Sequence, residues 1–182
     1  MGGDRLIAAK GPIAALAVSL LLLAAGCDDG DTPSATAGGE SGVVARVNDG
    51  DTLTLSGGAR VRLVQIDAPE LTTDCYGRAA QRALAALAPE GKRVSLVRDP
   101  ALDDRDTYGR LLRYVVVGDT DVNLELVRRG AASPYFFRNE RGEHAAELLD
   151  AVDVAREGRA GYWGACPGAR LNTGLGSITG PA

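Results

Sequence analysis

The nine residues from Arg62 to Glu70 constrain the fold most, because they join a β-strand pattern to a bend that carries charge. Side chains alternate with a period of two up to Ile66, as in a strand. Pro69 cannot donate a hydrogen bond to a sheet, so the strand should end near Asp67. Strict alternation places Arg62 and Asp67 on opposite faces, so they meet only if the chain bends between them.

Further strand and helix patterns surround this stretch. Five strands are expected, at 43–47, 52–55, 60–66, 92–98 and 111–117. Three helices are expected, at 76–88, 121–129 and 143–157, with Asp74 and Asp121 as N-caps of the first two. One helix falls between the third and fourth strands and the others follow the fifth. This order predicts an α+β fold, a five-stranded Greek-key β-barrel of the oligonucleotide-binding type with about three helices.

Residues 1–26 resemble a signal peptide. Arg5 and Lys10 precede a short apolar run that ends in small residues, the pattern of a secretory signal. Cys27 follows Ala24-Ala25-Gly26, as in a bacterial lipoprotein cleavage box. We therefore expect an extracytoplasmic protein held at the cell membrane by a lipid on Cys27. Ordinary secretion and an uncleaved anchor are the alternatives, and in both of them Cys27 carries no lipid.

Composition divides the rest of the chain into three parts. Residues 27–42 are rich in Asp, Gly, Ser and Thr and predict a flexible linker. Residues 43–167 have the length of one small domain, which we expect to be a monomer. The Gly-rich segment 168–182 predicts a disordered tail.

Charge and cysteine content limit the partners and the compartment. The chain has 20 lysines and arginines against 24 aspartates and glutamates. A nucleic-acid-binding protein usually shows a basic surface, so any positive field here must be local. If Cys27 is lipidated, Cys75 and Cys166 remain as an even pair, which predicts a disulfide in an oxidising compartment. Two free thiols are the alternative.

Carboxylates and arginines occur where a metal ion and a phosphate could bind. Asp51 follows a glycine turn, Asp67 lies at a strand end, and Glu70 follows a proline. Ca²⁺ prefers several oxygen ligands, and an uncoordinated carboxylate can act as a general base on water. Arg62 and Arg110 could meet over one barrel face and stabilise a phosphate in its transition state. The alternatives are a plain hairpin turn at Asp51, a solvated Glu70, and surface ion pairs such as one between Arg110 and Asp106.

Three ordered motifs carry a family resemblance. They are Asp49-Gly50-Asp51-Thr52, Arg62 through Asp67-Ala68-Pro69-Glu70, and Tyr108-Gly109-Arg110. Together they resemble the staphylococcal nuclease (thermonuclease) family, and the similarity continues through Val127-Arg128-Arg129-Gly130 to Tyr162-Trp163. It covers nearly the whole predicted domain.

The resemblance implies a Ca²⁺-dependent phosphodiester hydrolase. This family cleaves DNA and RNA, prefers single-stranded regions and leaves 3′-phosphate ends. The implied metal ligands are the side chains of Asp51 and Asp67 and the carbonyl of Ala68. The implied catalytic residues are Glu70, which would activate or position water, and Arg62 and Arg110, which would hold the scissile phosphate. Tyr108 would line the nucleotide pocket, and Asp49 would stand behind the metal ligands.

The sequence departs from this family at two places. Ala68 replaces a threonine, which keeps the backbone ligand and removes a hydroxyl. Two tyrosines that flank the nucleotide correspond to Phe136 and Arg138 here, with Tyr135 nearby. We therefore predict that Phe136 stacks on a base, although the aromatic run 135–137 could equally fill the core. Tyr162 and Trp163 are expected to cap the core, and His144 to face water. A non-catalytic barrel that binds single strands or a protein is the alternative function.

Overall fold

The structure is a computed structural model that describes residues 39–172 and 178–179. The predicted signal peptide, Cys27 and most of the predicted linker lie outside these residues. The strands are β1 Ser41–Val47, β2 Thr52–Leu55, β3 Arg60–Leu63, β4 Ile66–Asp67, β5 Arg93–Val97, β6 Leu111–Val117, β7 Thr120–Asp121, β8 Ser133–Pro134, β9 Arg170–Leu171 and β10 Ile178–Thr179. The helices are α1 Gly77–Leu87, α2 Val122–Arg128, α3 Ala145–Glu157 and α4 Tyr162–Ala165, with a 3₁₀ turn at Phe137–Asn139.

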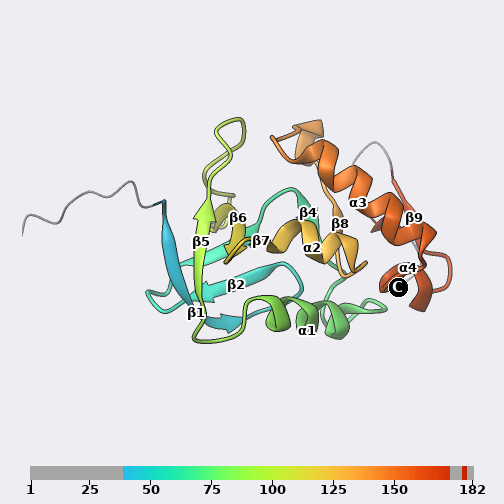
Figure 1. Cartoon of the computed structure of the whole chain (residues 1–182), viewed down its shortest axis with the longest axis horizontal. Helices are drawn as coiled ribbons and strands as arrows, with labels where there is room; N and C mark the ends of the chain where they lie inside the picture. The colour runs from blue at the N-terminus through green and yellow to red at the C-terminus, as the bar shows by residue number, and fades with distance from the viewer. Residues whose placement is uncertain (1–38, 173–177, 180–182) are drawn as a thin grey trace, which may run out of the picture. The chain divides into compact units, whose positions relative to one another are not determined.

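Five strands close into a barrel, as the sequence predicts (Figure 1). The order around the barrel is β3-β2-β1-β5-β6, and a parallel pairing between β3 and β6 closes it. All other neighbouring pairs are antiparallel. Short β7 extends β6 and leads directly into α2. The closure places Arg62 on β3 beside Leu112 on β6, two residues after Arg110.

The core lies inside the barrel and continues beneath the helices. Leu53, Val61, Leu63 and Val115 are fully buried strand residues. Leu126 of α2 and Leu148 of α3 join the same cluster, and α2 contacts both α1 and α3. Burying apolar surface on both sides of the barrel wall stabilises the closed sheet.

The third predicted strand ends earlier than expected. Strand β3 stops at Leu63, and the chain turns at Val64 and Gln65, where Gln65 has a left-handed φ of 62°. Ile66 and Asp67 then form β4, which pairs with β8. This turn supplies the bend that Arg62 and Asp67 need in order to meet.

Contacts from a distant segment hold the turn in place. Gln65 is 6 % exposed, its Nε2 donates to the Glu140 carbonyl (2.9 Å), and its Oε1 accepts from the Gly142 N–H (2.8 Å). Its own carbonyl accepts from the Tyr135 N–H (2.8 Å). Left-handed backbone is costly for a residue with a side chain, so the surrounding structure must compensate for it.

The helix caps are partly as predicted. Asp121 caps α2, because its Oδ1 accepts from the Leu124 N–H at 3.0 Å. Asp74 does not cap α1, which begins after Tyr76, a residue with φ 77° and no side-chain cap. The Asp74 carboxylate binds the Glu70 N–H instead. The predicted cap at Asp74 is therefore wrong.

Some regular structure lies outside the predicted domain limits of 43 and 167. Strand β1 begins at Ser41, inside the predicted linker, and Glu40 pairs with Arg113 of β6. Strands β9 and β10 pair within the predicted tail, so that part of it takes regular structure. Among the described residues, no helix has the length and apolar character needed to cross a membrane.

Candidate active site

Arg62 of β3 lies between two aspartates, Asp51 and Asp67. Its Nη2 donates to Asp67 Oδ1 (2.8 Å), and its Nη1 lies 3.1 Å from Asp51 Oδ2. Nη1 also donates to the carbonyls of Leu63 and Ile66 across the turn. The Arg62 side chain is 13 % exposed, so these contacts fix the guanidinium group.

Both carboxylate oxygens of Asp51 accept hydrogen bonds from neighbouring residues. Its Oδ2 accepts from the Ala68 N–H (2.8 Å), and its Oδ1 accepts from the Thr52 hydroxyl (3.0 Å). Burial raises the pKa of Asp51 to about 6, although Arg62 acts to lower it. Asp49 and Asp67 add repulsion that raises it further. Burial likewise raises the pKa of Asp67, against the lowering effect of Arg62.

Arg110 joins this group through Thr52. Its Nη1 donates to Thr52 Oγ1 (3.4 Å), the same hydroxyl that donates to Asp51. Its Nε donates to Asp106 Oδ2 (2.6 Å), so the ion pair considered as an alternative from sequence is present. The backbone N–H groups of Tyr108 and Arg110 also donate to Asp106. Asp106 thereby fixes Arg110 without covering it.

A cleft of about 370 Å³ brings the two arginines together. Arg62 and Arg110 both line it, as does Tyr108, which is 80 % exposed and lies under the Arg110 guanidinium at 5.5 Å. The other wall is formed by residues of the 135–140 segment, including Tyr135, Phe137 and Arg138. The cleft offers two fixed cations and exposed aromatic faces, which suit a phosphate and a base.

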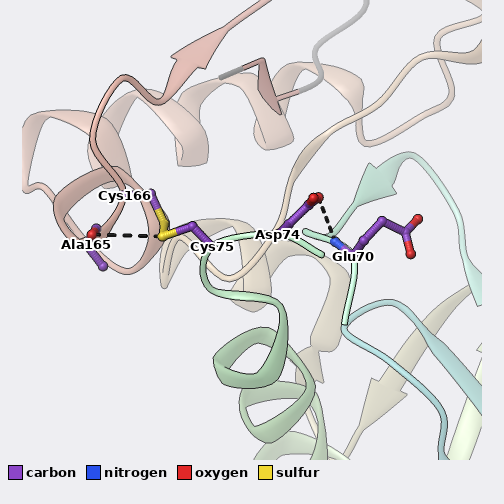
Figure 2. The surroundings of a disulfide bond; sticks show 5 residues. All are labelled: Glu70, Asp74, Cys75, Ala165 and Cys166. Carbon is purple, nitrogen blue, oxygen red and sulfur yellow. Dashed lines mark hydrogen bonds between the residues drawn. A yellow bond between two sulfur atoms is a disulfide. The ribbon is translucent and has the colours of Figure 1, made fainter. Parts of the chain in front are cut away.

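Glu70 lies three residues after Asp67, on the segment between β4 and α1, and is not among the residues that line the cleft. It is exposed, and within the described residues no hydrogen bond or ion pair holds its carboxylate. Its backbone is held by Asp74, as Figure 2 shows, while its side chain points away from Asp74. A carboxylate without such a partner can accept a proton from water.

Comparison with known proteins decides the family. A profile described as "Staphylococcal nuclease homologue" matches residues 60–165. The chain is 34 % identical over 135 residues to a thermonuclease of Staphylococcus intermedius, covering 67 % of this chain and 78 % of that protein. The chain belongs to the staphylococcal nuclease family.

Two further relatives have endonuclease names. Endonuclease YhcR of Bacillus subtilis (strain 168) is 31 % identical over 147 residues, which cover 72 % of this chain but only 12 % of that protein. An uncharacterized endonuclease of Escherichia coli is 37 % identical over 126 residues, covering 67 % of this chain and 76 % of that protein. The domain is therefore that of a phosphodiester hydrolase of the staphylococcal nuclease family.

The structure brings together most of the site residues predicted from this family. Arg62 contacts both Asp51 and Asp67, and Arg110 is linked to Asp51 through Thr52. In the described part of the chain, no group of three or more acidic, histidine or cysteine side chains is arranged to hold a metal. The predicted metal ligands are fewer than three such side chains, because they are two carboxylates and the backbone carbonyl of Ala68.

Phe136 is a predicted site residue whose place in the structure does not fit its predicted role. Its side chain is fully buried, and Arg141 lies over its ring at 4.6 Å. It cannot stack on a base without leaving the core. Tyr135 and Phe137 flank it and line the cleft, and Phe137 is 53 % exposed. The aromatic run therefore has one residue in the core and two at the cleft.

Sequence reasoning missed Thr52 and Gln65. Thr52 is fully buried and joins Asp51 to Arg110, and its only sequence signal is its place directly after Asp51. Gln65 carried no signal, because a single glutamine in a strand pattern does not predict a left-handed turn. Tyr162 is buried as expected, and Trp163 packs against the core. His144 is partly covered, with its ring 4.4 Å from that of Tyr114.

Cys75 and Cys166 form a disulfide (Figure 2). It joins the residue before the N-cap of α1 to the residue after α4, which are separated by 91 positions. Cys75 Sγ lies 4.0 Å from the Ala165 carbonyl oxygen, and because a disulfide sulfur has no proton to donate, this is a packing contact. The disulfide lies next to the segment that carries Glu70.

Proposed function

We propose that the chain is a Ca²⁺-dependent endonuclease that hydrolyses phosphodiester bonds of DNA and RNA and leaves 3′-phosphate ends. One observation carries the proposal. Arg62 and Arg110 face one cleft, where Arg62 contacts Asp51 and Arg110 contacts Thr52, the next residue along the chain. The exposed Tyr108 beside them suits an unpaired base, which favours single-stranded substrates.

The acidic residues fit a divalent cation. Asp49, Asp51 and Asp67 repel one another, because Asp49 and Asp67 act to raise the pKa of Asp51 and Asp49 acts to raise that of Asp67. Arg62 supplies one positive charge among three carboxylates, so net negative charge remains. Asp51, Asp67 and the Ala68 carbonyl would hold the ion, and water would complete its shell. Bound there, Ca²⁺ would help to neutralise the charge on the phosphate.

The proposed reaction uses this chain's own groups. Glu70 accepts a proton from water, and the water oxygen forms a bond to phosphorus. The bond from phosphorus to the 5′ oxygen breaks, and that oxygen leaves as an alkoxide that takes a proton from solvent water, so the phosphate stays on the 3′ side. Arg62 and Arg110 stabilise the charge that grows on the phosphate oxygens, and they are already fixed by Asp67 and Asp106.

The location of the enzyme is part of the proposal. The signal-like sequence of residues 1–26 and the cleavage-box pattern before Cys27 support export and a lipid anchor. A disulfide between Cys75 and Cys166 persists best in an oxidising compartment. We propose that the enzyme acts as a monomer outside the cytoplasmic membrane. Globomycin, an inhibitor of lipoprotein signal cleavage, should make the precursor accumulate, and normal processing in its presence would refute the lipid anchor.

A nuclease assay tests the function. Single-stranded DNA is incubated with the protein in Ca²⁺ or in excess EGTA, and the products are separated on a gel. We expect cleavage only with Ca²⁺, and loss of most turnover in Glu70→Gln with DNA binding kept. Glu90→Gln, an exposed glutamate on the turn after α1, is the matched control and should keep full activity.

The assay also separates the alternatives. Full activity in EGTA would remove the metal from the mechanism, and unchanged turnover in Glu70→Gln would remove Glu70. Strands that are retarded but intact in Ca²⁺ would favour the non-catalytic binding module.

A further inference from the structure

The position of Glu70 depends on its backbone. Its carboxylate has no hydrogen bond or ion pair within the described residues, so no neighbouring side chain aims it. The residues that follow it form a turn that runs straight into α1. A general base must lie within hydrogen-bond reach of its water, so something else must fix this segment.

Asp74 holds both backbone groups of Glu70. Its Oδ2 accepts from the Glu70 N–H at 2.9 Å, and its own N–H donates to the Glu70 carbonyl at 3.2 Å. The Asp74 carbonyl in turn accepts from the Gly77 N–H at 3.3 Å. A Cβ on Gly77 would lie 2.0 Å from the Glu70 carbonyl oxygen, so the start of α1 lies directly against Glu70.

The disulfide ties this turn to the body of the domain. Cys75 follows Asp74 and is bonded to Cys166, which is 4 % exposed. The Cys166 N–H donates to the carbonyl of Tyr162, a buried residue of α4. The Tyr162 N–H donates to the Gly130 carbonyl, after α2. Figure 2 shows the disulfide and the Asp74–Glu70 contact on the same short segment.

We propose that Asp74 and the Cys75–Cys166 disulfide are positioning residues that hold Glu70 where it meets the attacking water. This inference rests on the proposed role of Glu70 as the base. Neither Asp74 nor the disulfide lines the cleft that contains Arg62 and Arg110. Their loss should therefore lower kcat and leave KM unchanged, because small displacements of a catalytic group reduce turnover strongly.

The negative charge of Asp74 is not needed for this role. An asparagine side chain keeps a carbonyl oxygen that can accept from the Glu70 N–H. Asp74→Asn should therefore keep kcat, whereas Asp74→Ala should lose it.

The test measures kcat and KM on single-stranded DNA in Ca²⁺ for Asp74→Ala, Asp74→Asn and Cys75→Ser/Cys166→Ser. Each change is made in the wild-type chain and in the Glu70→Gln chain. We expect kcat to fall ~10- to 100-fold for Asp74→Ala and for the double serine variant, with KM unchanged. In the Glu70→Gln background the same changes should have almost no effect, because the group they position is already gone.

Asp121→Ala is the matched control. It removes a carboxylate bond to the Leu124 N–H at the start of α2, away from Glu70, and should leave kcat unchanged. An equal fold-loss of kcat in both backgrounds, or full kcat in Asp74→Ala, would overturn the inference. If the double serine variant does not fold, the two Asp74 variants decide alone. Full activity of Glu70→Gln by itself would instead refute the proposed role of Glu70, and this inference with it.

Discussion

Removal of the disulfide should destabilise the folded domain strongly. Cys75 and Cys166 close a loop with a sequence separation of 91 residues. In the chain-entropy description, a cross-link over this separation lowers the entropy of the unfolded chain and stabilises the fold by about 4.6 kcal/mol at 25 °C. We therefore expect Cys75→Ser/Cys166→Ser to lower the free energy of unfolding by about that amount.

The expected shift in melting temperature follows from the size of the domain. The unfolding entropy of a folded part of roughly 130 residues is about 0.27 kcal/mol/K near the melting temperature. A loss of about 4.6 kcal/mol then lowers the melting temperature by about 17 °C. Since small domains are stable by only about 5–15 kcal/mol, the variant should still fold at low temperature but with a small margin.

Urea unfolding followed by circular dichroism measures this loss. Wild type reduced by dithiothreitol should unfold at the same urea concentration as the double serine variant. Cys27→Ser is the control and should match wild type, because Cys27 is not part of the disulfide. A loss below about 1 kcal/mol in a two-state transition would refute the entropic reasoning, because it would show that the unfolded chain gains little freedom.

Three further predictions concern the site and its supports. Phe136→Ala should lower the free energy of unfolding by about 3–5 kcal/mol because a buried ring is lost. Phe137→Ala should leave stability unchanged and raise KM. Equal stability of the two variants would contradict the assignment of Phe136 to the core and Phe137 to the cleft. Burial acts to raise the pKa of Asp106, but the hydrogen bonds from Arg110 lower it below its ordinary 3.8. The stabilisation from Asp106 is therefore present above its unfolded pKa and is lost as pH falls through the lowered pKa of the folded state. The stability difference between wild type and Asp106→Asn should shrink in acid. A stability difference that is independent of pH would refute this prediction. Gln65→Ala leaves two backbone groups without partners, so it should lower the free energy of unfolding by about 1–3 kcal/mol and reduce turnover. Full turnover would show that the turn at Gln65 does not position the site residues.

Much of the barrel could be predicted from local sequence. Strand patterns in the sequence indicated β1, β2 and β3, and the Asp121 cap indicated the start of α2. These signals depend on neighbours a few positions apart, which is why they can be recognised without the fold. The cap predicted at Asp74 is wrong because the Asp74 carboxylate accepts a hydrogen bond from the Glu70 N–H instead.

The sequence determined the residue types of the site, but it did not determine that these side chains lie close together. The ordered motifs around Asp51, Arg62 and Arg110 identified the candidates, because each motif is a short contiguous pattern. Their convergence needed the closure of β3 against β6 and the left-handed turn at Gln65. That turn is held by the Glu140 and Gly142 backbone, more than 70 residues away.

The same division applies to the aromatic run and to Glu70. The sequence placed three aromatic residues together at 135–137, but tertiary packing decided that Phe136 is buried and that Phe137 lines the cleft. The sequence supplied Glu70 and two cysteines, whereas the fold brought Cys75 and Cys166 together beside that glutamate. Local patterns thus determined which groups the protein has, and long-range contacts decided where those groups point, because burial and chain closure depend on residues that lie far apart in the sequence.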